Sequence, residues 1–162
     1  MLLPIHKGDY KPLPGEADLT AAMRGQQLQP GDYMFPHCGS MKEVGTPEMI
    51  EKFTQGPVGF LTVIPSGPPT MGKSLVQWFL FSILISIFAG YIATLGGLAA
   101  GSPYMDVFRI TGTVAILGYG ISNFTNSIWK GVSWGVSMKF LFDGVIYGLV
   151  TAGTFGWLWP AA

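Results

Sequence analysis

The chain has 162 residues with nine basic and nine acidic side chains, so it carries no net charge at neutral pH. Binding of nucleic acid phosphates needs an excess of Lys and Arg, and we therefore expect no nucleic acid partner. The single cysteine, Cys38, excludes an intramolecular disulfide and a cysteine-rich zinc site made by this chain alone.

Charge and proline divide the chain into two parts. Residues 1–73 hold thirteen of the eighteen charges and ten of the twelve prolines, whereas residues 74–162 hold the remaining five charges. We therefore predict an all-α integral membrane protein. A proline- and glycine-rich, largely irregular N-terminal tail over residues 1–73 precedes a three-helix transmembrane domain over residues 74–162.

Two short helices are predicted in the tail. Thr46 is a favourable capping residue, proline and glutamate follow it, and Gly56 is a natural end. A second candidate runs from about Asp18 to Arg24. The apolar segments 33–35 and 58–64 have no core of their own. We therefore expect them to lie on a surface, which could be the membrane domain, the lipid or another protein.

A possible copper site also lies in the tail. Met34, His37, Cys38 and Met41 place thioether, imidazole and thiol groups within eight residues, and these ligand types suit Cu(I). A turn that presses apolar side chains onto a surface explains the same residues. Handling of Cu(I) is our third hypothesis for the function, and the sequence predicts no other metal or cofactor.

Residues 67–74 match the phosphate-loop pattern G-x-x-x-x-G-K-[ST]. Two of its positions are prolines without an N–H group, and the 23 residues from 74 to 96 are uncharged. This context predicts a membrane span instead of a nucleotide site. Gly72, Lys73 and Ser74 would lie at headgroup depth and could bind a lipid phosphate, or Lys73 could be a plain interfacial anchor.

Three spans are predicted, over residues 74–96, 107–129 and 140–159, because each apolar stretch is about long enough to cross a bilayer. Lys73, Lys130 and Lys139 then share one side of the membrane, and Arg109 lies on the other. The positive-inside rule puts the N-terminus in the cytoplasm and the C-terminus on the opposite side of a bacterial-type inner membrane.

Small residues recur along two of the spans and predict close helix packing. The third span carries a glycine ridge, Gly144, Gly148, Ala152 and Gly156, and the first span carries a weaker counterpart, Ser82, Ser86 and Gly90. The ridge could close the bundle of this chain, or it could contact another subunit.

Asp143 and Arg109 are the charges that fall within the predicted spans. Each has an opposite charge on its own helix, Lys139 four residues before Asp143 and Asp106 three residues before Arg109, and each pair can meet on one helix face. In the predicted topology Asp143 and Arg109 lie at opposite membrane faces and cannot form one site. Asp143 is the residue that most needs testing.

For the function we expect a non-catalytic accessory, scaffolding or assembly subunit of a larger membrane complex. The alternative is a small transporter or channel component formed by homo-oligomerisation, with Ser122, Asn123 and Asn126 lining the path. The expected partners are the lipid bilayer and either other membrane subunits or further copies of the chain. We expect no enzyme and assign no catalytic residue, because no nucleophile and base are suitably placed.

Overall fold

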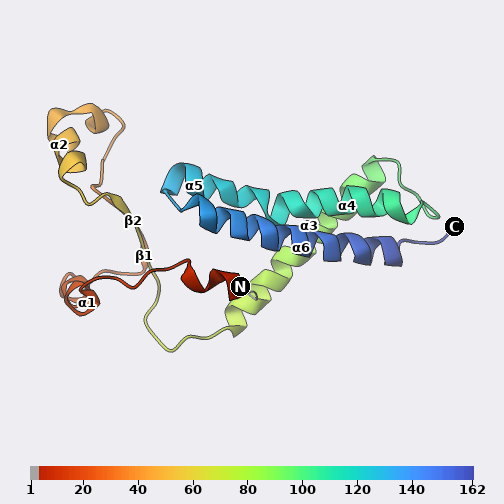
Figure 1. The fold of residues 1–162 in the computed structure, drawn as a ribbon, viewed down its shortest axis with the longest axis horizontal. Helices are drawn as coiled ribbons and strands as arrows, with labels where there is room; N and C mark the ends of the chain where they lie inside the picture. Colours follow the sequence, from red (N-terminus) through yellow and green to blue (C-terminus); the bar gives the residue numbers. More distant parts are fainter. Residues whose placement is uncertain (1–3) are drawn as a thin grey trace. The chain divides into compact units, whose positions relative to one another are not determined.

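The structure is a computed structural model that describes residues 4–162. These residues form two compact units (Figure 1). One unit is residues 8–68. The other is residues 69–162 together with the N-terminal segment as far as Lys7.

Both helices predicted in the tail are present in the first unit. The earlier one is α1, Glu16–Gly25, and the later one is α2, Pro47–Gln55, which follows a short 3-10 helix η2 at Glu43–Gly45. The backbone N–H of Met49 donates to Oγ1 of Thr46 at 3.4 Å, so Thr46 caps α2 as predicted.

An exposed ion pair lies on α2. Nζ of Lys52 donates to Oε1 of Glu48 at 2.8 Å. The hydrogen bond and the charge of Lys52 lower the pKa of the Glu48 carboxyl group, and the same contact raises the pKa of Lys52. Both side chains are exposed to solvent, so this ion pair contributes little to the stability of the unit.

The prediction of an all-α chain with a largely irregular tail is wrong for the two apolar tail segments. They pair as an antiparallel sheet of β1, Gly31–Phe35, and β2, Gly59–Val63, with Tyr33 opposite Leu61. The hydroxyl of Thr62 donates to Oδ1 of Asp32 at 2.7 Å across the strands. Pairing satisfies the backbone groups of each segment that face the other strand. Within residues 8–68, however, Met49 is the only buried hydrophobic residue.

Two helices of the second unit are long and apolar enough to cross a membrane. They are α3, Gly72–Leu95, and α6, Trp134–Leu158. α3 coincides closely with the first predicted span, and α6 covers the third except for its last residue but begins six residues earlier. An additional short 3-10 helix, η1, lies at Pro4–Gly8 near the N-terminus.

The region of the second predicted span is not one continuous helix. It is divided into α4, Tyr104–Tyr119, the 3-10 turn η3, Ile121–Asn123, and α5, Phe124–Lys130. The side-chain amide of Asn123 donates to the carbonyl oxygens of Tyr119 at 3.1 Å and Gly120 at 3.3 Å. The amide thus partners carbonyl groups where the regular α-helical pattern ends.

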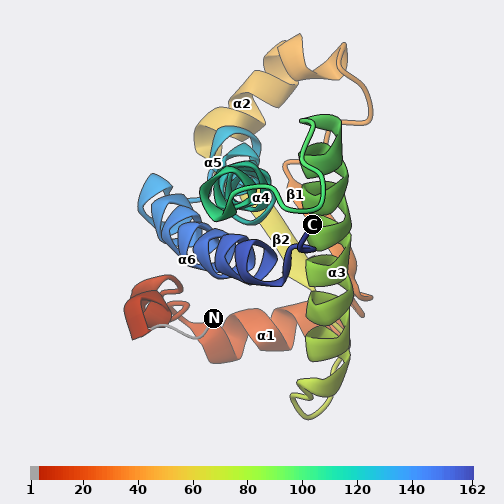
Figure 2. The same cartoon turned by 90° about the vertical axis from the view of Figure 1, so that its right-hand side faces the viewer.

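Within this unit α4 and α5 run antiparallel to α6, and α3 crosses the pair obliquely (Figures 1 and 2). Val107 and Thr111 of α4 and Ser137 of α6 are fully buried. Two hydrogen bonds tie the C-terminal end of the unit to the loop between α3 and α4. Nε1 of Trp159 donates to the carbonyl of Ala99, and the N–H of Gly101 donates to the carbonyl of Pro160, each at 2.8 Å.

Candidate functional site

A buried carboxylate lies in the first half of α6 and has a partner that the sequence did not predict. Nε2 of His6, on η1, lies 2.9 Å from Oδ2 of Asp143. The side chains of His6 and Asp143 are only 4% and 8% exposed. The ring of His6 also packs 5.2 Å from the ring of Phe140, between centroids. The N-terminal segment is therefore held against α6.

The hydrogen bonding of this carboxylate is incomplete. Oδ1 of Asp143 is buried and has no hydrogen-bond partner among the residues that the structure describes. A carboxylate can accept about four hydrogen bonds, and burial makes each missing one costly. The group therefore retains capacity for a donor that the described residues do not supply.

Asp143 is also part of the wall of a cavity of about 510 Å³. Residues from α3, α4, η3 and α6 and the residue before α3 form this wall, and most of them are apolar. The size and the ratio of apolar to polar groups are typical of sites that bind small molecules. The lining residues are Met71, Ser74, Leu75, Trp78, Phe81, Gly118, Tyr119, Ser122, Asn123, Phe140, Asp143 and Tyr147.

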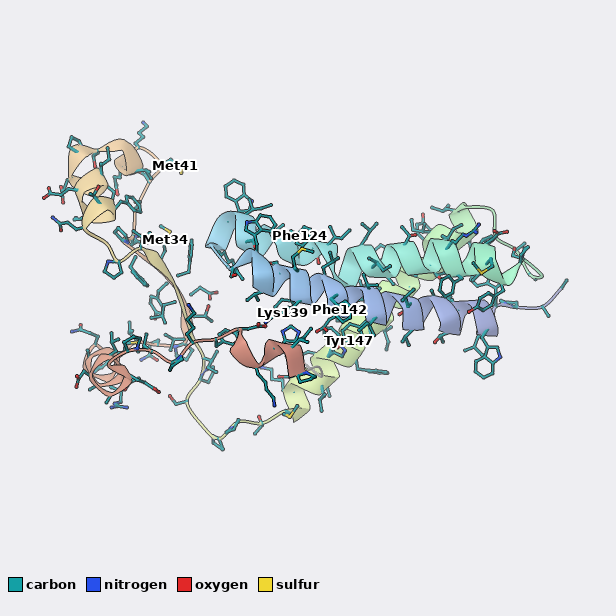
Figure 3. All side chains as sticks on the ribbon, viewed as in Figure 1. Met34, Met41, Phe124, Lys139, Phe142 and Tyr147 are labelled. Atoms are coloured by element: carbon teal, nitrogen blue, oxygen red, sulfur yellow. The ribbon has the colours of Figure 1, made fainter. Side chains whose placement is uncertain are left out.

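Four aromatic side chains in this wall form a continuous cluster, which we call the aromatic cluster: Trp78, Phe81, Tyr119 and Tyr147. The ring of Trp78 lies 5.5 Å from Tyr147 and 6.0 Å from Tyr119, and Tyr119 lies 5.8 Å from Tyr147, between centroids. Phe81 meets Tyr119 edge to face at 5.6 Å. Tyr147 projects from α6 near its crossing with α3 (Figure 3). The cluster therefore joins three helices.

Helical periodicity brings the acid and the cluster together. Asp143 and Tyr147 are four residues apart on α6 and lie on the same face. Gly144 follows Asp143 and Gly148 follows Tyr147. Because these glycines have no side chains, α4 approaches α6 closely. That approach brings Tyr119, near the end of α4, to Tyr147.

The glycine ridge packs against α4 of the same chain. A Cβ atom at Gly144 would collide with the backbone of Gly120, and one at Gly148 would collide with Ile116. A Cβ atom at Gly156 would come within 2.6 Å of the ring of Tyr104. Ala152 belongs to the same contact, because its Cβ lies 2.9 Å from the position of a Cβ added at Gly112 on α4. The ridge thus makes the intramolecular contact, the first of its two predicted uses.

The weaker ridge of α3 has a different environment. Ser82 and Ser86 face a second cavity of about 470 Å³, between α3 and α6, and each hydroxyl donates to a carbonyl oxygen one turn earlier in α3. Gly90 lies near the ring of Phe155, which would be 3.5 Å from an added Cβ atom. α3 therefore meets α6 through aromatic rings and open space, without the close backbone contact of α4.

The two predicted intramembrane charges do not come together. Asp143 lies next to Gly144, which contacts Gly120 at the end of α4. Arg109 is in the first half of α4, whose residues Tyr104 and Gly112 contact the last third of α6. The two residues thus lie several helical turns apart along the α4–α6 pair.

The polar residues predicted for other roles are divided between the cavity and its surroundings. Gly72, Lys73 and Ser74 form the first turn of α3, and of these Ser74 lines the cavity of Asp143. Ser122 and Asn123 line the same cavity, whereas Asn126 lies on α5 outside its wall. Two of the three residues predicted to line a solute path thus share a cavity within one chain.

The copper candidates lie in the unit of residues 8–68. Met34 is in β1, whereas His37, Cys38 and Met41 are in the loop that follows, and Met34 and Met41 are drawn apart in Figure 3. Met41 is 88% exposed. Across residues 4–162 no group of three His, Cys, Asp or Glu side chains is arranged to hold a metal. A Cu(I) site that uses methionine sulfur stays a prediction.

His6 is the site residue that sequence reasoning missed. It is 137 positions from Asp143 and belongs to a proline-containing segment without periodicity, so no local pattern connects the two. For the aromatic cluster the sequence contains one weak indication, because Tyr147 follows Asp143 by about one helical turn and therefore shares its helix face.

Comparison of the chain with protein-family models, with curated proteins and with solved structures found no match.

Proposed function

We propose that this chain is an integral membrane protein that binds a small solute in the cavity at Asp143 and acts as a component of a solute-handling membrane system. The observation that carries the proposal is the buried carboxylate of Asp143, which lines a largely apolar cavity of about 510 Å³ and has one oxygen without a hydrogen-bond partner in the described part of the chain. A buried acid without a full set of partners costs stability, so its presence suggests a functional role.

The proposed topology has three crossings, with the N-terminus in the cytoplasm. The first is α3, the second is the broken helix from α4 through α5, and the third is α6. α6 has 25 residues and is about 37 Å long at ~1.5 Å per residue, and the broken helix follows it antiparallel. The cavity would then lie near the cytoplasmic face, because Ser74 is at the start of α3 and Asp143 is early in α6.

Cysteine labelling tests this topology. Cys38 is the single cysteine of the chain, so the wild-type protein reports on the side of residues 8–68. In a Cys38→Ser background, Ala162→Cys reports on the C-terminus. A membrane-impermeant maleimide should label Ala162→Cys in intact cells and Cys38 only in inverted vesicles. Labelling of both cysteines from the same side contradicts the three-crossing topology.

A binding screen tests the proposed function. The full chain in lipid nanodiscs is heated with small neutral, anionic and cationic compounds, because a ligand that binds only the folded state raises the unfolding temperature. At least one compound should stabilise the wild type and should fail to stabilise Tyr147→Leu, which alters the cavity wall. Trp157→Leu is the control, because Trp157 is 82% exposed and lies outside that wall. Equal stabilisation of wild type and Tyr147→Leu, or none at all, contradicts the proposal.

A second candidate function is the accessory subunit of a larger membrane complex. The unit of residues 8–68 favours it, since only Met49 is a buried hydrophobic residue there while Met41, Val58 and Ile64 are exposed. Purification in mild detergent should then recover stoichiometric partner proteins, and a chain without residues 8–68 should lose them. Recovery only as an isolated monomer would contradict this role and leave the solute-binding proposal in place.

A further inference from the structure

The cavity of Asp143 combines two groups that recognise the same kind of ligand. One is a carboxylate with a free acceptor atom, and the other is the aromatic cluster of Trp78, Phe81, Tyr119 and Tyr147. Carboxylates attract cations by charge, and the faces of aromatic rings attract them through the ring quadrupole. Both preferences exclude an anion.

No other charge in the wall opposes this preference. Among the described residues that line the cavity, Asp143 is the only charged one. Its Oδ2 lies 2.9 Å from Nε2 of His6, and the ring of His6 packs at a tilt against the ring of Phe140. If Nε2 of the histidine carries the proton as a neutral donor, the carboxylate keeps its negative charge while one oxygen is held in place.

The unused atom narrows the class of cation. Oδ1 receives no hydrogen bond from residues 4–162, and an ammonium N–H supplies such a donor whereas a quaternary ammonium or a phosphonium does not. A bare metal ion is a poor fit, because metal sites need several ligand groups, and no group of three His, Cys, Asp or Glu side chains suited to a metal occurs in residues 4–162.

The rest of the wall specifies the body of the ligand. Met71, Leu75 and Phe140 are apolar and lie around the aromatic cluster, while Ser74, Ser122 and Asn123 are the neutral polar groups of the wall. A flat or branched apolar body would fill such a space, and its burial would add to the affinity.

We propose that the cavity between α3, α4 and α6 is a binding site for a protonated amine with an apolar, preferably aromatic, body. The ammonium group pairs with the carboxylate of Asp143 once a rotation of that side chain brings Oδ1, which is buried here, to the cavity, and the body packs against Trp78 and Tyr147. This inference names the ligand class of the solute-binding function proposed above and rests on that function.

Calorimetric titration of the full chain in phosphatidylcholine nanodiscs tests the inference, with empty nanodiscs as the blank. The three probes share a phenyl body and differ in charge: 2-phenylethylamine, which is protonated at neutral pH, 2-phenylethanol, which is neutral, and 3-phenylpropionate, which is an anion. The amine should bind with one molecule per chain, and the other two should bind at least about tenfold more weakly, because they lose the ionic hydrogen bond.

Two variants separate the two parts of the site. Asp143→Asn keeps the shape and an acceptor for His6 but removes the charge, and it should weaken amine binding by about 10–100-fold. Trp78→Leu removes a ring of the aromatic cluster and should weaken amine binding by about 3–30-fold. This variant tests the site even if Asp143→Asn does not fold. Trp157→Leu should bind the amine as the wild type does, because Trp157 lies outside the cavity wall.

The outcomes distinguish this inference from the function on which it rests. Equal affinity for the amine and the alcohol, or unchanged amine affinity in a folded Asp143→Asn protein, overturns the amine assignment. A second outcome is that the amine does not bind, whereas the alcohol or the anion binds and Trp78→Leu weakens that binding. The amine assignment is then wrong, and the solute-binding function stands. If no probe binds and the wider screen finds no compound that depends on Tyr147, both fall.

Discussion

The contact of α6 with α4 and its contact with α3 are built on opposite principles. The contact with α4 uses residues that have almost no side chain, and Gly144 lies against the backbone of Gly120. The contact with α3 uses large rings, Trp78 against Tyr147, and cavities lie beside it. Close backbone packing leaves no room for a ligand, whereas rings that meet at their edges leave space between helices. The candidate site therefore lies on the α3 side of α6, where the packing leaves cavities.

The largest effect is expected where the backbones touch. Gly144→Ala puts a methyl group into the backbone of Gly120, and α4 must move to accommodate it. We expect unfolding in denaturing detergent to become easier by about 3 kcal/mol, at the upper end of the range for overpacked sites.

Gly153→Ala is the matched control, because the nearest atom to its new methyl group would be the Tyr104 hydroxyl oxygen at 3.8 Å. This variant should be unchanged or up to about 1 kcal/mol more stable, since alanine favours the helix. Equal destabilisation of both variants would mean that the α4–α6 contact is not the close one.

A smaller effect is expected at the hydrogen-bonded pair of His6 and Asp143 beside the cavity. His6→Ala removes the partner of Oδ2, so that neither oxygen of the Asp143 carboxylate has a hydrogen-bond partner among the described residues. The free energy of unfolding should therefore fall by about 2 kcal/mol. Denaturant titrations of His6→Ala, Asp143→Ala and the double variant measure the coupling between the two side chains.

The other histidine provides the control for this cycle. His37 lies in the exposed loop after β1, and His37→Ala should leave the stability unchanged within about 0.5 kcal/mol. Strictly additive effects of His6→Ala and Asp143→Ala would show that the two side chains do not interact.

A hydroxyl pair tests the α5–α6 extension of the close contact. Oγ of Ser127 lies 2.6 Å from Oγ of Ser137, and both residues are buried. Ser137→Ala leaves one hydroxyl group unsatisfied and should cost about 1 kcal/mol, whereas replacement of both serines by alanine should cost less than the single change. Thermal unfolding followed by circular dichroism measures the stability of both variants. A double variant that is less stable than Ser137→Ala would contradict the pairing.

The smallest effect is expected on the α3 side. Ser82 faces the second cavity, and its hydroxyl donates to Trp78 O of its own helix at 3.0 Å. Ser82→Ala should therefore change the free energy of unfolding by no more than about 0.5 kcal/mol. A loss as large as that of Ser137→Ala in the same thermal experiment would show that α3 packs more tightly than the rings and cavities indicate.

Local sequence patterns account for the apolar helices and for the small-residue face of α6. The uncharged run after Lys73 predicted α3 almost to its ends, and the four-residue repeat from Gly144 to Gly156 predicted a close contact of α6. Thr46 and Gly56 likewise predicted the limits of α2. These features succeed because hydropathy, helical period and capping are local properties of neighbouring residues.

The contacts between distant segments could be seen only in the folded chain. Folding paired β1 with β2, two segments for which the sequence predicted irregular chain, and it broke the second predicted span at Gly120. It also brought His6 to Asp143 and Trp78 to Tyr147, and thus formed the candidate site. Such contacts depend on shape and on hydrogen-bond demand between residues far apart in the chain, and no local pattern encodes them.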